Sequence, residues 1–291
     1  MKPLERGHKK LLNAWAFYDW ANSVYSLTIV STIFPIFYGL LFRIAKLTHI
    51  ELFGMVIKST SVIAFVTALA FAVVVVLSPI LSGIADYLGN KKSFMRFFCY
   101  LGAISCVGLY WFSLEHIYFG LLCYFCGVVG FWGSIVFYNS YLPDIALPEQ
   151  YDAVSAKGYS LGYTGSVLLL IFNLIMVMKP QWVGFATADA ETTLTTMRIS
   201  FITVGIWWIG FSSIPFYYLP SYKKGRGEFS KSILFNGFKE LRKVWQSLSA
   251  SPRLKWYLIA FFVYSMGVQT VMLIATYFGE QEIQWANSEE S

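Results

Sequence analysis

The stretch SVIAFVTALAFAVVVVLSPILSGI, residues 61–84, runs for 24 residues without a charged side chain. A transmembrane helix needs about 20 consecutive, mostly apolar residues. Lys58 and Asp86 mark where charged side chains return on either side of the run. This stretch therefore predicts a helix that crosses a lipid bilayer.

The composition of the whole chain agrees with that prediction. Hydrophobic residues make up 57% of the 291 residues, charged residues make up 13%, and the mean hydropathy is +0.57. Soluble domains carry about 25% charged residues, and a soluble fold of this length could not bury so much apolar surface. We expect the lipid bilayer to be a partner of the chain, and we do not expect it to bind nucleic acid.

Seven segments are long and apolar enough to span, so we predict an all-α polytopic membrane protein. The first segment is longer than one span needs, and Pro35 is the expected place for it to bend. The predicted spans are Ala14–Phe42, Ser61–Ile84, Phe94–Leu114, Ile117–Asn139, Gly158–Met178, Met197–Leu219 and Leu254–Phe278.

The positions of Lys and Arg predict the orientation, because cytoplasmic loops carry an excess of these residues. The N-terminus and every second connection hold 17 of the 22 Lys and Arg residues. The opposite side holds the remaining five, which are Arg43, Lys46, Lys58, Lys179 and Arg198. The N-terminus is therefore expected in the cytoplasm, and an odd number of spans would leave the C-terminus outside.

One long connection, Pro220 to Arg253, joins the sixth and seventh predicted spans. Apolar residues recur in it at three- and four-residue spacing among basic ones, a pattern typical of an amphipathic helix that rests on a membrane surface. A helix that binds a partner protein is the alternative interpretation. The apolar positions are Leu234, Phe238, Leu241, Trp245 and Leu248.

The first span carries an unusual number of polar residues: Tyr18, Asp19, Asn22, Ser23 and Ser26. The last four are offset by three, four and seven positions and so share one helix face. A charge at the centre of a bilayer costs about 2.5–3.5 kcal/mol on insertion scales, so such residues usually serve a function. Asp19 could bind a cationic substrate or a coupling proton. Alternatively, it lies near the cytoplasmic end and is paired with a basic residue or with water.

Further polar positions in later spans are candidates for lining a solute cavity. They are Asn139, Ser166, Asn173 and Gln269, the last among Ser265, Thr270 and Thr276. The fifth span opens with Gly158, Gly162 and Gly165, a small-residue spacing that favours close helix packing. A substrate path lined by their backbone is the alternative.

The loop after the second span contains Asp86, Gly89, Lys91 and Lys92. Gly89 permits a tight turn between two helices. Asp144, at the end of the fourth span, should lie near this loop and could form an ion pair with Lys91 or Lys92. A solvated carboxylate is the alternative for Asp144.

Motifs of an enzyme or of a cofactor site do not stand out. The sequence has no phosphate-binding glycine loop, no metal-ligand spacing and no nucleophile next to a base. Cys123 and Cys126 form a C-x-x-C, which we interpret as small buried residues because no second pair or nearby histidine accompanies them. We therefore predict neither an enzyme nor a resident cofactor or metal.

Five motifs occur in order along the chain: WAFYDWANS (15–23), IFP (33–35), GIADYLGNKK (83–92), FYNSYLPDIA (137–146) and VSAKGYSLGYTG (154–165). Together they resemble the vacuole-effluxer-like branch of the major facilitator superfamily. The loop after the second span departs from the superfamily pattern at Ser82, usually Gly, and at Tyr87, usually Arg.

The resemblance implies a fold of about twelve helices in two halves of six, with a solute site between the halves. It also implies alternating access, and it implies export of apolar amino acids for the fungal member. The short N-terminus resembles bacterial members, so a bacterial inner membrane is expected.

On this basis the chain divides into four parts. Residues 1–219 would form the N-terminal six-helix half, 220–253 a cytoplasmic linker, 254–278 the first helix of the second half, and 279–291 a polar tail. This organisation predicts a truncated secondary transporter of a small solute such as an amino acid, with protons as a candidate coupling ion. The alternatives are a receptor-like or assembly-partner membrane protein that transports nothing, or a truncated transporter without function.

Overall fold

The computed structural model describes residues 5–88, 90–186, 189–221, 246 and 251–278. Within these ranges, the side chains of nine residues in two helices are not described: 83, 84, 86–88, 272, 273, 276 and 277. Several predicted features lie outside the described part. They are the amphipathic helix of the linker (Leu234, Phe238, Leu241, Trp245 and Leu248), the polar tail 279–291, Gly89, and the side chains of Asp86 and Thr276.

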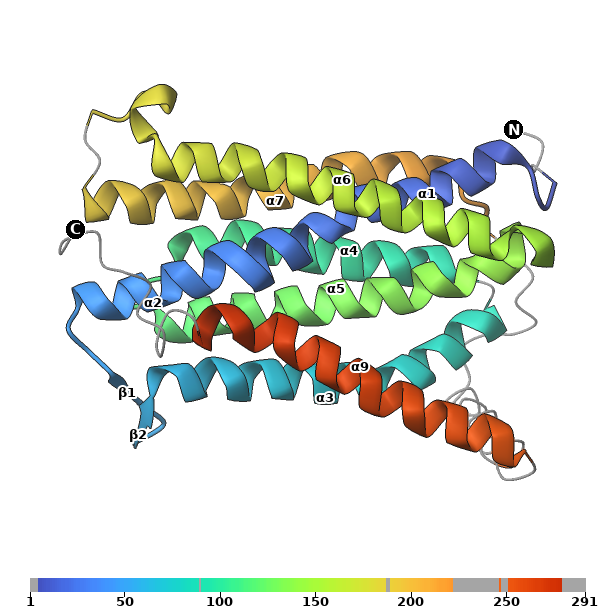
Figure 1. Cartoon of the computed structure of the whole chain (residues 1–291), viewed down its shortest axis with the longest axis horizontal. Helices are drawn as coiled ribbons and strands as arrows, with labels where there is room; N and C mark the ends of the chain where they lie inside the picture. Colours follow the sequence, from blue (N-terminus) through green and yellow to red (C-terminus); the bar gives the residue numbers. More distant parts are fainter. Residues whose placement is uncertain (1–4, 89, 187–188, 222–245, 247–250, 279–291) are drawn as a thin grey trace.

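Long helices run side by side in one bundle (Figure 1). Among the described residues, six of these helical segments are long and apolar enough to cross a membrane. They are α1 (Lys9–Val24) continued by η1 (Tyr25–Ile33) and α2 (Phe34–Ile44), then α3 (Ser59–Leu88), α4 (Lys91–Gly108), α5 (Ile117–Ile145), α6 (Tyr151–Met178) and α7 (Ala190–Tyr218). The prediction of an all-α polytopic membrane protein is thus confirmed.

Short elements connect the spans. A two-stranded antiparallel hairpin follows α2, and single turns of 3₁₀-helix follow α4, α5 and α6. These elements are β1 (His49–Leu52), β2 (Met55–Lys58), η2 (Leu109–Trp111), η3 (Pro148–Gln150) and η4 (Pro180–Val183). The sequence analysis did not foresee the hairpin.

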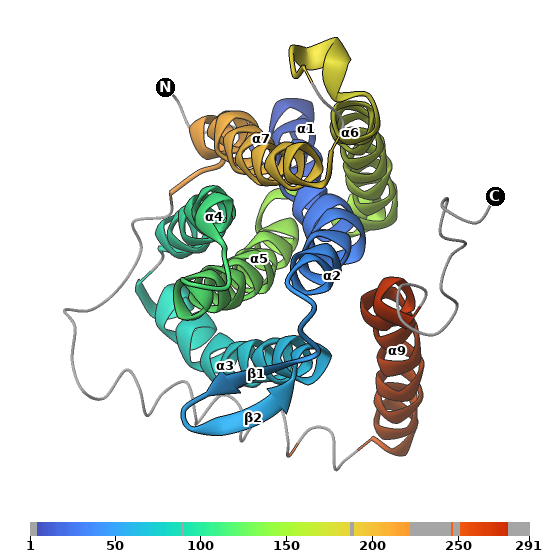
Figure 2. The same ribbon diagram turned by 90° about the vertical axis from the view of Figure 1, so that its left-hand side faces the viewer.

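The seventh predicted span coincides with α9 (Pro252–Phe278). This helix is not one of the six that meet the criteria for a span, so its crossing of the membrane stays a prediction. It contacts α2 and η1 and stands beside the other helices in the end-on view (Figure 2).

The first span changes its hydrogen-bond register at η1, which is a π-helix of nine residues. The Phe34 N–H donates to the carbonyl of Ile29, five residues back, and the α-helical register resumes beside Pro35. Proline has no N–H to donate, so one backbone hydrogen bond of the helix is lost at Pro35 whether the helix is of the α or the π type. The sequence analysis placed a bend at Pro35, and the structure shows this change of register immediately before it.

Glycines set how closely the helices cross. A Cβ at Gly130 of α5 would lie 2.7 Å from the backbone oxygen of Phe98 in α4. A Cβ at Gly205 of α7 would lie 2.7 Å from the backbone oxygen of Ala103, also in α4. Such contacts let α4, α5 and α7 pack backbone to backbone, as small residues do in membrane helix bundles.

A candidate solute site around Asp19

Asp19 lies ten residues after α1 begins at Lys9 and is half-buried. Its carboxylate Oδ2 accepts a 2.9 Å hydrogen bond from the hydroxyl of Tyr138 in α5. The other acidic residues of the six spans lie close to helix ends and are Asp86, Asp144, Glu149, Asp152 and Glu191. Within the described part of the chain Asp19 makes no salt bridge, so the predicted alternative of a basic partner is not found there.

Two residues of α1 hold Tyr138 in position. Trp15 stacks on the Tyr138 ring with centroids 4.2 Å apart and 11° between the planes. The Trp15 Nε1 also donates a 2.8 Å hydrogen bond to the Tyr138 backbone carbonyl. Tyr18 is fully buried and lies 5.2 Å from Tyr138, centroid to centroid. A ring packed in this way has little freedom, so its hydroxyl stays at the Asp19 carboxylate.

The glycines of α6 pack against the same side of α1. A Cβ at Gly158 would lie 2.7 Å from Asp19 Oδ2, and one at Gly162 would lie 2.7 Å from Ser23 Oγ. At Gly165 the nearest atoms belong to Trp20, at 3.0 Å. The interpretation of these glycines as packing residues is confirmed. Their absent side chains also leave the room in which the Asp19 carboxylate lies.

The remaining polar residues of the first span are divided between the core and the Asp19 side. Ser23 Oγ donates a long, 3.4 Å hydrogen bond to Asn22 Oδ1. Asn22 is fully buried, and its Nδ2 has no partner among the residues that the structure describes. Ser26 is half-buried. Tyr18 and Asn22 therefore support the site from within the bundle, while Asp19, Ser23 and Ser26 are the members that retain exposed surface.

The candidates from the later spans do not join this cluster. Asn139 is exposed although its neighbour Tyr138 is buried. Ser166 is buried and bonds its own helix at the Gly162 carbonyl, 2.7 Å away. Asn173 is buried between α6 and α7, where Thr203 donates a 2.8 Å bond to its Oδ1. Ser166 is thus held by a bond within α6, and Asn173 by a bond between α6 and α7.

The candidates of the seventh predicted span are also separate. Gln269 is exposed on α9, and Ser265 is half-buried. Because α9 contacts α2 and η1 rather than α1, Gln269 is not brought to the Asp19 carboxylate.

The loop residues form an ion pair at one end of the bundle. Lys91 Nζ lies 2.8 Å from Asp144 Oδ2 and joins the start of α4 to the end of α5. Of the two alternatives for Asp144, the structure shows the ion pair. Lys92 instead donates a 2.7 Å hydrogen bond to the backbone carbonyl of Leu219, at the end of α7.

Sequence reasoning missed further contacts at that end. Arg96 donates a 3.2 Å hydrogen bond to the Phe216 carbonyl, and Arg6 donates a 2.8 Å bond to the Ala146 carbonyl. Cations near the last carbonyls of a helix stabilise its C-terminus. In the sequence, Arg6 and Arg96 served only as orientation signals, and nothing in their spacing indicated which carbonyls they bind.

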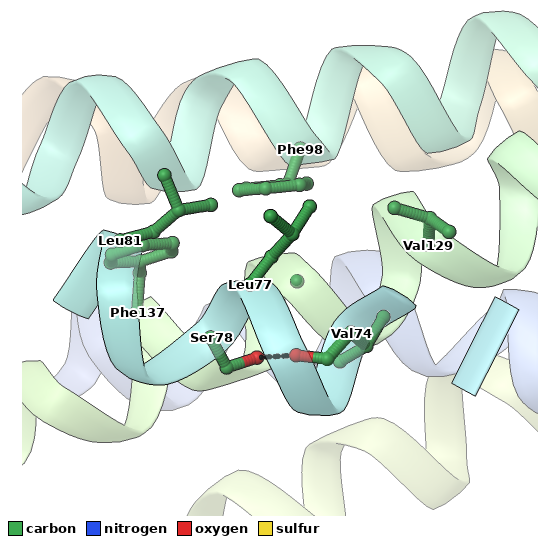
Figure 3. Close-up of a pocket in the computed structure, with 8 residues that line it drawn as sticks. Val74, Leu77, Ser78, Leu81, Phe98, Val129 and Phe137 are labelled. Carbon is green, nitrogen blue, oxygen red and sulfur yellow. Dashed lines mark hydrogen bonds between the residues drawn. The ribbon is translucent and has the colours of Figure 1, made fainter. Parts of the chain in front are cut away.

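A small apolar pocket lies elsewhere, between α3, α4 and α5 (Figure 3). Leu77, Phe98, Val129 and Phe137 line it, and the Ser78 hydroxyl is already bonded to the Val74 carbonyl at 2.6 Å. Its volume of about 10 Å³ leaves room for about one water molecule at most, so it is too small for a solute.

Residues that could hold a metal or serve a redox role are not clustered. The part of the chain that the structure describes contains no group of three His, Cys, Asp or Glu residues able to bind a metal ion. Cys123 is buried and Cys126 is half-buried, and both are free thiols. The interpretation of this C-x-x-C as packing residues agrees with these positions.

Comparison with known proteins places the chain in a family. A family model described as vacuole effluxer Atg22 like matches residues 7–290, nearly the whole chain. The chain belongs to this family. An uncharacterized transporter of the major facilitator type, YxiO of Bacillus subtilis, is 32% identical over 274 residues, which cover 92% of this chain and 59% of that protein. The resemblance to this branch of the superfamily is therefore confirmed.

The fungal relatives are more distant. Autophagy-related protein 22-1 of Aspergillus clavatus is 20% identical over 309 residues, covering 82% of this chain and 50% of the relative. Autophagy-related protein 22-2 of Neosartorya fischeri is 21% identical over 313 residues with the same coverage. The chain of this vacuole-effluxer-like protein thus spans about half the length of the curated relatives it matches. No solved structure matches it.

Proposed function

We propose that this vacuole-effluxer-like chain takes part in secondary transport of a small solute by alternating access, with Asp19 as the charged group of the solute path. The observation that carries the proposal is the pair formed by Asp19 and Tyr138. It places a half-exposed carboxylate with a neutral partner well inside the first span. Charged groups within a membrane bundle usually mark substrate or ion pathways.

The geometry at Asp19 suits a group that exchanges partners. The phenol hydroxyl of Tyr138 occupies one acceptor site of the carboxylate, and a carboxylate has about four such sites. A cationic ligand could use the remaining sites without displacing Tyr138. The stacked Trp15 would keep the phenol in place while the ligand comes and goes.

For the solute we propose a small molecule with an ammonium group, such as an amino acid. An ammonium donates three hydrogen bonds and would pair with the Asp19 carboxylate. Coupling to a proton is the second role that the carboxyl group could serve. Exchange of labelled for unlabelled solute by an Asp19→Asn variant distinguishes the two roles.

For the location we propose a bacterial inner membrane with the N-terminus in the cytoplasm. The Bacillus relative supports a bacterial origin. The contacts of Arg6 with Ala146 and of Lys91 with Asp144 support the orientation, because they gather basic residues from separate connections at one end of the bundle.

A ligand-dependent stability measurement tests the proposal on the purified chain. Solutes from several classes, including neutral, acidic and basic amino acids, would be added while the thermal unfolding midpoint is recorded. A ligand present at 100 times its dissociation constant stabilises the folded state by about 2.7 kcal/mol. We expect stabilisation by a solute with an ammonium group and none in the Asp19→Asn variant. Equal stabilisation of both proteins would place the solute elsewhere. No response to any solute would favour a membrane protein that acts as an assembly partner.

A further inference from the structure

The β1–β2 hairpin carries an apolar tip that has no role in the proposed solute path. It lies at the end of the bundle beside the start of α3 (Figure 1). Its inner side is packed: Leu52 is buried, and Ile50 and Ile57 contact the hydrophobic core. At the tip, in contrast, Phe53 is 83% exposed and Val56 is 73% exposed.

The turn itself is unusual for an aromatic residue. Leu52 pairs with Met55, so the loop consists of Phe53 and Gly54, with φ angles of 51° and 75°. Two-residue hairpin loops with both φ angles positive favour Asn or Asp followed by Gly. A bulky side chain in this left-handed region is strained. Phe53 therefore occupies a position that local conformation does not favour, and its ring is not covered by the described residues.

A contact with α5 fixes the direction of the tip. The Phe53 backbone N–H donates a 3.2 Å hydrogen bond to the Tyr118 hydroxyl, and the two rings meet edge to face at 5.3 Å. Tyr118 lies in the first turn of α5, and Leu122 follows one turn deeper; both are exposed. The apolar tip is thus continuous with the outward surface of a membrane-spanning helix.

The surroundings of the tip have the features of a membrane–water interface. Arg43, Lys46 and Lys58 are exposed near the hairpin, and Glu51 is the one acidic residue between positions 43 and 58. Trp111 and Trp182, each at a helix end on this side, are exposed as well. Tryptophan and tyrosine gather at the headgroup level of bilayers, where basic side chains meet lipid phosphates.

From these observations we infer that the β1–β2 hairpin is a membrane-interface anchor that inserts Phe53 and Val56 among the lipid headgroups. Its partner is the phospholipid surface of the leaflet at this end of the bundle. Lys46 and Lys58 would contact phosphate groups while the apolar tip leaves water. The anchor would hold the connection between the first two spans against the bilayer.

Photo-crosslinking of the full chain tests this inference. The purified protein would be reconstituted in vesicles of phosphatidylethanolamine and phosphatidylglycerol, with p-benzoylphenylalanine placed at position 53. Position 122, on the outer surface of α5, is the lipid-facing control, and position 149, exposed at the opposite end, is the control outside the hydrocarbon. Mass spectrometry then identifies the adduct.

We expect phospholipid adducts at position 53 in a yield similar to that at 122, and a much lower yield at 149. Two results would overturn the inference. One is crosslinking of position 53 to a second copy of the chain, or to a part of the chain other than its neighbour Tyr118, in place of lipid. The other is an absence of adducts at 53 while 122 reacts.

A second variant separates lipid contact from folding. Phe53→Asn should keep the hairpin, because Asn tolerates a positive φ better than Phe does. In this variant the lipid adduct of a p-benzoylphenylalanine at position 56 should fall severalfold. An unchanged yield at position 56 would contradict the role of Phe53 as an anchor.

Discussion

Gly158 of α6 faces Asp19 of α1 so closely that a Cβ on this glycine would lie 2.7 Å from the carboxylate Oδ2. The same Cβ would lie 3.0 Å from the Tyr138 hydroxyl. A glycine that packs α6 against α1 is therefore also in contact with the carboxylate that we propose binds the solute. A change that leaves the bundle intact can still move the carboxylate.

The first prediction concerns Gly158→Ala. The added methyl group must displace the Asp19 carboxylate or the Tyr138 hydroxyl, because carbon and oxygen atoms do not approach so closely. We expect solute affinity to fall about tenfold or more, equivalent to a loss of at least about 1.4 kcal/mol of binding free energy. Isothermal titration with a solute found in the stability screen measures the change. Gly210→Ala is the matched control, since nothing lies within 4 Å of its Cβ position. If both variants bind alike, Gly158 serves packing alone.

The second prediction concerns Gly130→Ala, at the crossing of α5 and α4. Here the Cβ would meet backbone, with the Phe98 carbonyl oxygen at 2.7 Å, and backbone cannot rotate aside as a side chain can. Overpacking of this kind costs about 1–3 kcal/mol. We expect a lower unfolding midpoint in detergent and less folded protein on expression. Gly210→Ala should keep or slightly raise stability, because alanine favours a helix over glycine by up to about 1 kcal/mol. A Gly130→Ala protein as stable as that control would refute the close crossing.

Much of the fold could be predicted because a bilayer imposes simple rules on sequence. The apolar run 61–84 lies within α3, and the first predicted span lies within Lys9–Ile44. Spans show in hydropathy because an unpaired backbone group is too costly in lipid. The β1–β2 hairpin was missed because its strands have only four residues each and its loop, Phe53 followed by Gly54, is atypical.

From the sequence, only those residues of the candidate site that lie on α1 could be predicted to lie near one another. Spacing put Asp19, Asn22 and Ser23 on one side of α1. In the structure Ser23 lies with Asp19 against Gly162 of α6, whereas Asn22 is buried in the core. The partner Tyr138 lies 119 residues away, and helix periodicity carries no information about such a distance. Asn139 was chosen from the same motif, but the structure turns it outward, since neighbouring residues on a helix face different directions.

The third prediction concerns the ion pair of Lys91 and Asp144. Their side chains are 18% and 34% exposed, so water screens part of their attraction. Exposed pairs contribute about 0.2–1 kcal/mol. We expect Asp144→Asn to lower the free energy of unfolding by a value in this range. A double-mutant cycle with Lys91→Gln isolates the coupling of the two residues. A coupling energy of zero would mean that the contact does not stabilise the bundle.

The fourth prediction concerns orientation in the membrane. Lys46 and Glu149 are exposed at opposite ends of the bundle. If the N-terminus lies in the cytoplasm, an impermeant maleimide should label Lys46→Cys in intact cells and Glu149→Cys only after lysis. Three of the native cysteines are buried and the fourth is half-buried, so the unmodified protein serves as the background control. Labelling of Glu149→Cys in intact cells would reverse the predicted topology.

The last prediction concerns Asp19, the centre of the proposed function. It is measured as transport into vesicles by a full-length relative in which the corresponding aspartate is changed to Asn. Asn keeps the shape of the side chain and can still accept a hydrogen bond from tyrosine, but it carries no charge and no exchangeable acid proton. Both proposed roles therefore predict the loss of concentrative uptake.

The exchange of labelled for unlabelled solute across the same vesicles decides between the two roles. A proton carrier would continue to exchange solute without accumulating it, whereas a ligand of the solute's ammonium group would lose exchange as well. We expect accumulation to disappear in the Asp19→Asn protein while its folding and vesicle incorporation stay unchanged. Accumulation at the level of the unmodified protein would contradict it and leave Asp19 with a structural role.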